Sequence, residues 1–262
     1  MTTTTLPRLP ASAGAAAPLP RRAAILVYGS AVYALFLATF LYLIGFVAGA
    51  FVPKHIDSGP AGPIAPALLG NALLLGLFAV QHAIMARPWW KQRWTRIVPV
   101  AAERSTFVLT TCMVLAVMVW FWQPLPGVVW RVEGAPAVGL HVVAACGWAI
   151  VLVSTFLIDH FELFGLRQVV LQFVGRPYTA PRFRERALYK LVRHPLMLGF
   201  LIAFWAAPVM TVGHLFFAAM CTAYILVGVR LEERDLVRAH GSAYRDYRRR
   251  VRGLLPLPRR VA

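Results

Sequence analysis

Five stretches of the chain contain no Lys, Arg, Asp or Glu, and all 27 basic and all 10 acidic residues lie outside them. They are Ile25–Phe51, Ile64–Ala86, Ser105–Trp122, Val138–Ile158 and Leu196–Val229. A helix rises about 1.5 Å per residue, so about 20 apolar residues cross a hydrocarbon core of about 30 Å. Each of the first four stretches is therefore long enough for one membrane crossing.

The fifth stretch has 34 residues, which is too long for one crossing and enough for a tight pair of helices. Pro208, Thr211, Gly213 and His214 lie near its middle, where a turn costs least. The pattern predicts an all-α integral membrane protein with four transmembrane helices, a C-terminal transmembrane helical hairpin and a cytoplasmic tail helix. We expect a disordered Thr-, Ala- and Pro-rich segment over residues 1–22 and one membrane-embedded domain over residues 23–262.

Composition and charge placement agree with this interpretation. The chain is 59% hydrophobic and only 14% charged, where soluble domains carry about 25% charged residues. Its net charge of +17 alone is compatible with nucleic-acid binding. However, basic and base-poor loops alternate along the chain, as the positive-inside rule requires. We therefore expect a protein of the inner (cytoplasmic) membrane with both termini in the cytoplasm, membrane lipids as partners and no nucleic acid.

The cysteines and histidines do not indicate a metal site. Cys112, Cys146 and Cys221 all lie inside predicted spans and are assigned to packing. No Cys/His cluster has zinc-like spacing, so no metal is expected. Oligomeric state is not fixed by the sequence.

Two groups of polar residues interrupt the predicted spans. Gln81 and His82 lie inside the second, where they either form an interhelical hydrogen bond or face a substrate as donor or base. Asp159, His160 and Glu162 follow the fourth, and they form either a proton-accepting cluster or the ordinary polar end of a helix. Both alternatives stay open for each group.

The most specific segment lies at the entrance to the fifth stretch. Arg193 and His194 precede Pro195, which suits the first turn of a helix because its missing N–H would be unpaired there. Gly199, one turn further, lets a flat ligand or another backbone approach closely. A helix N-terminus also favours a carboxylate.

The predicted hairpin returns the chain to the side where it entered, so Glu232 and Glu233 should lie near Arg193 and His194. The result is either a compact site with donors on one wall and carboxylates on the other, or a surface salt bridge. In the tail, Tyr244 and Tyr247 share a helix face and either close over a ligand or lie in the membrane interface.

These motifs together resemble the integral membrane methyltransferases, which include isoprenylcysteine carboxyl methyltransferases and phospholipid N-methyltransferases. The resemblance covers residues 187–255, and its residues are Arg193-His194-Pro195, Gly199, Glu232-Glu233, Tyr244 and Tyr247. Met197 stands where the isoprenylcysteine enzymes usually have Tyr. That departure puts one cofactor contact in doubt and makes a long prenyl substrate less expected.

Segments outside that region are similar to one branch, the bacterial methanethiol S-methyltransferases, which are related to NnrU-like membrane proteins. They are Phe78–His82, Ala86–Trp89, Glu103–Thr106, Pro124–Pro126 and Asp159–Gln168. This resemblance runs from about residue 24 to the tail and implies S-adenosylmethionine-dependent methylation of a small thiol, methanethiol to dimethyl sulfide.

The resemblance also implies roles for individual residues. The implied cofactor contacts are Arg193, His194, Pro195, Leu196, Met197, Gly199, Glu232, Glu233, Tyr244 and Tyr247. The nucleophile must be a thiolate, and a free thiol with a pKa of about 8.5 is mostly protonated at neutral pH. The candidate bases are His82, Asp159, His160 and Glu162, of which we prefer Asp159 or His82.

Two other functions compete with this one. The first is a related membrane methyltransferase that acts on a lipid or isoprenylcysteine acceptor. The second is a non-catalytic NnrU-like membrane protein with haem or a transport role. A cofactor site at Arg193 and Glu232 favours either enzyme over the non-catalytic protein.

Overall fold

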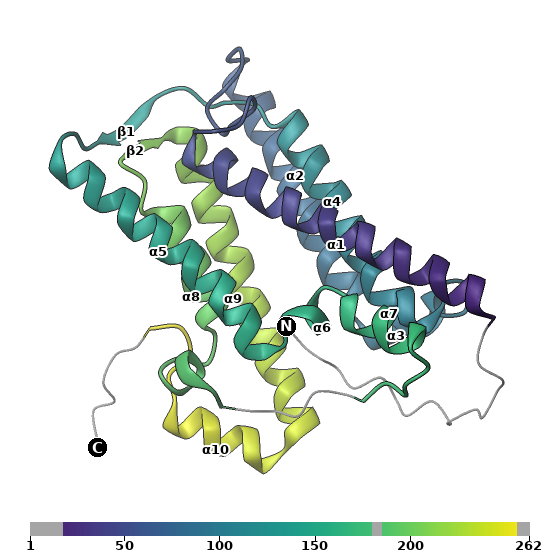
Figure 1. Ribbon diagram of the computed structural model, residues 1–262. Coiled ribbons are helices and arrows are strands. Elements are labelled where there is room, and N and C mark those ends of the chain that lie inside the picture. The colour runs from purple at the N-terminus through teal and green to yellow at the C-terminus, as the bar shows by residue number, and fades with distance from the viewer. Residues whose placement is uncertain (1–17, 180–184, 256–262) are drawn as a thin grey trace. The chain divides into compact units, whose positions relative to one another are not determined.

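The computed structural model describes residues 18–179 and 185–255, and it is mostly α-helical (Figure 1). Five helical segments are long and apolar enough to cross a membrane, which confirms a helical integral membrane protein. These segments are α1 (Leu19–Ala48), α2 (Ile64–Met85), Val100–Phe121, α5 (Ala135–Ile158) and α9 (Val212–His240). The segment Val100–Phe121 joins a 3-10 turn, η1 (Val100–Ala102), to α4 (Glu103–Phe121).

The chain divides into two compact units, which are described separately below. The described part of the N-terminal unit is residues 18–125 and 159–179. It holds α1, α2 and α4 with three shorter helices, α3 (Pro88–Trp94), α6 (His160–Leu163) and α7 (Leu166–Phe173). The described part of the C-terminal unit is residues 126–158 and 185–255.

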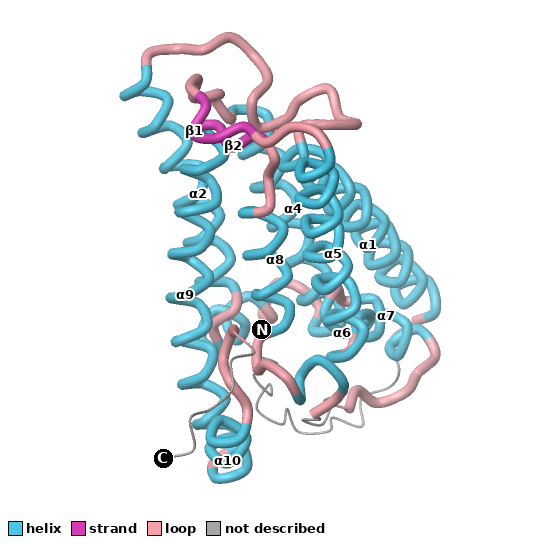
Figure 2. The backbone as a smooth tube through the Cα atoms, turned by 90° about the vertical axis from the view of Figure 1, so that its left-hand side faces the viewer, coloured by secondary structure: helices cyan, strands magenta, loops and turns pink. Residues whose placement is uncertain are grey.

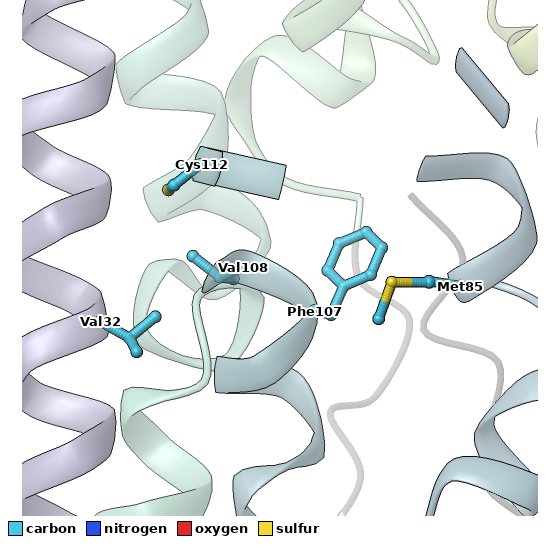
Figure 3. Close-up of a cluster of buried hydrophobic side chains, with 5 residues drawn as sticks. All are labelled: Val32, Met85, Phe107, Val108 and Cys112. Atoms are coloured by element: carbon cyan, nitrogen blue, oxygen red, sulfur yellow. The ribbon is translucent and has the colours of Figure 1, made fainter. Parts of the chain in front are cut away.

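The N-terminal unit is built around α4, which packs against both α1 and α2. Val32 of α1, Met85 of α2, and Phe107, Val108 and Cys112 of α4 form one buried apolar cluster (Figure 3). Between helices in lipid there is no hydrophobic driving force, so the close van der Waals packing of such side chains is what favours their association. Cys112 therefore has the packing role that the sequence predicted.

Helix α1 begins earlier than the sequence predicted. Residues 1–17 of the expected disordered segment lie outside the described residues, but residues 19–22 are helical. Pro20 suits the first helical turn because its missing N–H would be unpaired there. Arg22 donates from Nε to the Gln172 carbonyl at 2.9 Å and from its terminal nitrogen to the Phe173 carbonyl at the end of α7. These bonds to the end of α7 account for an ordered helix start.

The C-terminal unit contains α5, α9, the short helices α8 (Pro195–Trp205) and α10 (Ser242–Arg250), and a 3-10 turn, η2 (Ala187–Lys190). Helices α5 and α8 lie side by side (Figures 1 and 2). A Cβ added to Gly199 would lie 2.7 Å from the Gly147 carbonyl oxygen, and one added to Gly147 would lie 2.7 Å from the Ala203 nitrogen. Only glycine at both positions allows the two backbones to approach this closely.

The two helices of the fifth stretch differ greatly in length. Helix α8 has 11 residues and α9 has 29. Helix α8 rises about 16 Å, and the six residues Ala206–Thr211 between them add up to about 20 Å when extended. That total is close to the rise of about 30 Å from Val212 to Glu232 along α9. The chain therefore still returns to its entry point, as predicted.

Part of that extended segment forms a short strand that the sequence analysis missed. Strand β2 (Val209–Thr211) pairs antiparallel with β1 (Val128–Arg131), so the protein is not purely α-helical. Trp130 of β1 donates its indole N–H to the Ala207 carbonyl at 3.0 Å. The pairing satisfies backbone groups where the helix is broken, which explains why the break is tolerated. The Thr211 side chain then accepts from the His214 N–H at 3.0 Å and caps α9.

Candidate functional site

The entrance to α8 and the end of α9 meet through one buried ion pair. Arg193 donates from Nε to Glu233 Oε1 at 2.8 Å, and its Nη2 lies 2.6 Å from the same oxygen. Arg248 of α10 places its Nε 3.3 Å from the other oxygen, Glu233 Oε2. Both Arg193 and Glu233 have side chains that are mostly buried. The proximity predicted from the sequence for these two residues is confirmed.

His194 lies between the two carboxylates of α9. Its Nε2 is 3.2 Å from Glu233 Oε1, and its Nδ1 is 3.7 Å from Glu232 Oε2. Burial lowers the pKa of His194 below its ordinary value, and the hydrogen bond with Glu233 opposes this effect. The predicted arrangement, with donors facing carboxylates, is therefore present in the C-terminal unit.

The C-terminal segment fixes this arrangement through its backbone. The Arg193 and His194 N–H groups donate to the Arg252 and Gly253 carbonyls at 2.8 and 3.1 Å. The Arg193 guanidinium also donates to the carbonyls of Arg248 and Val251. Residue 193 is thus bonded to α9, to α10 and to the segment after α10. It acts as the junction of the whole site.

Tyr244 and Tyr247 face the interior of the C-terminal unit. Together with Val251 they form a buried cluster against Leu236 and Val237, and the Tyr247 hydroxyl donates to the Tyr189 carbonyl at 2.6 Å. Burial raises the pKa of both tyrosines above its ordinary value. The structure thus gives both a packing role, and their contact with a ligand stays a prediction.

The first turn of α8 is also closely packed. Pro195 and Leu196 are buried, and Met197 is partly exposed. Gly199 admits another backbone, that of α5, which is one of the two alternatives predicted for it.

Asp159, His160 and Glu162 lie in the N-terminal unit, where the chain turns from α6 into α7. Asp159 accepts from the Glu162 N–H at 3.2 Å and caps α6. His160 Nε2 and the Tyr33 hydroxyl share a hydrogen bond of 2.8 Å. The Glu162 carboxylate accepts from Tyr178 at 2.5 Å and from Arg167 at 2.8 Å. All three therefore have structural partners.

The same turn depends on a glycine. Gly165 has φ +85°, and a Cβ there would lie 2.6 Å from Ser105 Oγ and 2.7 Å from the Ser105 nitrogen. Arg104 donates to the Leu163 carbonyl at 2.8 Å. The segment from Asp159 to Gln168 is thus packed directly on the beginning of α4.

His82 differs from the other candidate bases. Its ring packs between Phe78 and Phe107, with centroids 5.4 and 4.9 Å away. Its Nδ1 is buried and has no hydrogen-bond partner among the described residues. The neighbouring Gln81 donates to Thr110 at 3.2 Å, which is the interhelical hydrogen bond that the sequence offered as one alternative. An unpartnered buried ring nitrogen in a native protein calls for an explanation.

The sequence analysis missed several residues of these networks, among them Tyr178 and Arg248. Tyr178 lies in the segment after α7 and gave no motif, and Arg248 is one of several consecutive arginines. Burial raises the pKa of Tyr178, and its hydrogen bond to Glu162 adds to the effect. Only the fold reveals that each of them reaches a buried carboxylate.

These features define a helical integral membrane protein with a charged site at the α8–α9 entrance, and comparisons with known proteins specify the family. Residues 73–251 match a family described as a protein of unknown function, DUF1295. The chain is 52% identical to a methanethiol S-methyltransferase of Mycobacterium tuberculosis, over 92% of this chain and 99% of that protein. It is 53% identical to methanethiol S-methyltransferase 1 of Bradyrhizobium diazoefficiens, over 90% of this chain and 83% of that protein.

A more distant relative is a Nurim homolog of Drosophila pseudoobscura pseudoobscura. It is 30% identical over 65% of this chain and 70% of that protein. No solved structure matches the chain. The chain belongs to the family of the methanethiol S-methyltransferases, within DUF1295.

Proposed function

We propose that this protein is an S-adenosylmethionine-dependent methyltransferase that converts methanethiol to dimethyl sulfide. The observation that carries the proposal is the 52% identity to a protein named methanethiol S-methyltransferase over 99% of that protein's length. We further propose that the site faces the cytoplasm, because the loops on that side hold most of the basic residues.

The groups at the α8–α9 entrance suit such a cofactor. Arg193 and His194 supply cationic or neutral donors, and Glu232 and Glu233 supply carboxylate acceptors. A carboxylate on the ligand pairs best with a guanidinium, and an amino group or ribose hydroxyl pairs with a carboxylate. When bound, S-adenosylmethionine supplies an electrophilic methyl group on a sulfonium.

The protein's own residues must hold the acceptor sulfur as a thiolate. Among the four candidate bases, Asp159, His160 and Glu162 already have hydrogen-bond partners, whereas His82 Nδ1 has none among the described residues. A neutral imidazole has one acceptor nitrogen. We therefore propose that His82 takes the thiol proton, with Asp159 as the next candidate. The aromatic rings beside His82 suit an apolar acceptor such as methanethiol.

The experiment is headspace gas chromatography of membranes that contain the protein and methanethiol, with and without S-adenosylmethionine. We expect dimethyl sulfide only when the cofactor is present. Product formed without it would contradict the proposed cofactor. No product from a protein that binds the cofactor would move the search to a lipid or isoprenylcysteine acceptor, and no binding at all would favour the non-catalytic NnrU-like alternative.

The role of His82 is tested by His82→Ala, with His141→Ala as the matched control because His141 is an exposed histidine of α5. We expect His82→Ala to lower turnover about 100-fold, a typical contribution of general base catalysis, with cofactor binding largely intact. Asp159→Asn is measured beside it. Wild-type turnover in His82→Ala would rule out this base.

A further inference from the structure

Five arginines line one open cleft on the C-terminal unit. The cleft has a volume of about 530 Å³. Its lining residues are Arg193, Arg245, Arg248, Arg249, Arg252 and Gly253. It therefore lies beside the Arg193–Glu233 junction, and its other walls come from α10 and the segment that follows.

Two features of the fold hold these arginines close together. On the inner face of α10, Tyr244 and Tyr247 are buried, which leaves Arg245, Arg248 and Arg249 on the exposed face. The segment after α10 returns to the α8 entrance, where the Arg252 carbonyl accepts the Arg193 N–H at 2.8 Å. The packing of α10 and this backbone hydrogen bond therefore position the walls of the cleft.

Positive charge exceeds negative charge around this cleft. Glu233 pairs with Arg193 and Arg248, and Asp246 lies 3.1 Å from Arg249 on the exposed surface of α10. Along the chain, residues 242–253 hold five arginines and a single acidic residue, Asp246. Like charges at short range repel one another, and the cost is lowest when an anion lies among them.

We propose that this cleft binds the phosphate group of an anionic phospholipid. Guanidinium groups bind phosphate oxygens through paired, charge-assisted hydrogen bonds, which suits several arginines around one anion. Arg193, which lines the cleft, lies three residues before Leu196, where the charge-free stretch begins, so the cleft lies beside a membrane-spanning segment. Basic pockets in such positions on the cytoplasmic side bind anionic lipid headgroups. The proposal rests on the cytoplasmic placement proposed above.

The test uses the full-length protein in a neutral detergent, with thermal unfolding as the readout. The added probes are dioctanoyl phosphatidylglycerol, dioctanoyl phosphatidylcholine and inorganic phosphate at equal concentration. We expect phosphatidylglycerol alone to raise the unfolding midpoint by roughly 2–4 °C, because a ligand that binds only the folded state stabilises it. The shift should shrink in 0.5 M salt, which screens exposed charges.

Two double variants decide whether the cleft is responsible. Arg245→Gln with Arg249→Gln removes two charges from the cleft, and we expect it to lose more than half of the shift. Arg234→Gln with Arg238→Gln removes two exposed charges from α9 outside the cleft and should keep the full shift. Neither pair belongs to the proposed catalytic or cofactor residues.

Three results would overturn the proposal. An equal shift with inorganic phosphate would assign the cleft to a soluble anion. An equal shift in both double variants would place the lipid elsewhere. A tenfold weaker binding of S-adenosylmethionine in the Arg245→Gln, Arg249→Gln variant would make the cleft part of the cofactor site. Because no probe is a reactant, failure of lipid binding with normal dimethyl sulfide formation would leave the proposed function intact.

Discussion

Each unit contains a buried glutamate that is held by an arginine, Glu233 in the C-terminal unit and Glu162 in the N-terminal unit. Glu233 contacts three groups that are cationic or can become so, namely Arg193, His194 and Arg248. Glu162 contacts one cation, Arg167, and one neutral hydroxyl, that of Tyr178. The two networks thus differ in how much positive charge depends on a single carboxylate.

The partners also differ in exposure and in sequence distance. The side chain of Arg193 is 11% exposed, whereas that of Arg167 is 27% exposed. Arg167 follows Glu162 by five residues, but Glu233 lies 40 residues after Arg193. The Glu162 network stabilises a local turn, whereas the Glu233 network joins the beginning of α8 to the end of α9. We therefore expect the loss of Glu233 to affect the whole C-terminal unit.

The largest effect should come from Glu233→Gln. The amide keeps the size of the side chain and removes the charge, which leaves the mostly buried Arg193 without its counter-ion. Breaking a buried pair in this way costs about 3–5 kcal/mol, so the thermal unfolding midpoint in detergent should fall by many degrees. The control is Glu185→Gln, whose partner Arg250 is 62% exposed and whose loss should cost at most about 1 kcal/mol. An equal fall of the unfolding midpoint in the two variants would show that burial of the arginine does not decide the cost of losing its carboxylate.

The next effect concerns the helix packing that places Arg193 and His194. In Gly199→Ala the new methyl group would meet the Gly147 oxygen and the Val151 nitrogen of α5 at 2.7 and 2.8 Å. These are backbone atoms that cannot rotate away, so we expect a loss of about 1–3 kcal/mol in unfolding free energy. Gly139→Ala is the control on α5, because nothing lies within 4 Å of its added Cβ. A Gly199→Ala protein as stable as the control would show that α8 can move away from α5 at no cost.

The difference between the two networks also explains what the sequence could predict. The sequence predicts that Glu233 lies near Arg193, because a chain that crosses an apolar layer and returns must bring its two charged ends together. That argument holds although α8 is much shorter than α9, since the extended break makes up the missing rise. The break itself could not be predicted as a strand, because its partner β1 lies about 80 residues earlier.

The Glu162 network shows where such reasoning fails. Asp159 and Glu162 stood out as ionisable residues at a span end, but Tyr178 belonged to no motif and Tyr33 lies on α1. Hydrogen bonds between separate helices depend on which faces meet, and a single sequence does not contain that information. Gly199 shows an intermediate case, in which close approach was predicted but its partner, the α5 backbone, was not named.

Glu162→Gln is the substitution in the N-terminal unit that corresponds to Glu233→Gln. Arg167 is exposed enough to be hydrated when its carboxylate is lost, and Tyr178 needs only a neutral acceptor, which the amide provides. We expect a loss of about 1–2 kcal/mol, less than for Glu233→Gln. Asp246→Asn, on an exposed pair with Arg249, serves as the surface control and should cost less than about 1 kcal/mol. A loss as large as that of Glu233→Gln would mean that exposure of the cation does not decide the cost.

The smallest effect is the pH dependence that His194 contributes. Burial lowers its pKa in the folded protein below the ordinary value of about 6.5, so the unfolded chain takes up this proton more readily. The stability that His194 contributes is thus fully present above about pH 6.5 and is lost as the pH falls through the folded-state pKa. We expect the unfolding midpoint to fall more between pH 7.5 and pH 5 in wild type than in His194→Gln. His141→Gln, an exposed histidine, should keep the wild-type slope. An equal slope in His194→Gln would mean that the hydrogen bond to Glu233 offsets the effect of burial on the pKa in full.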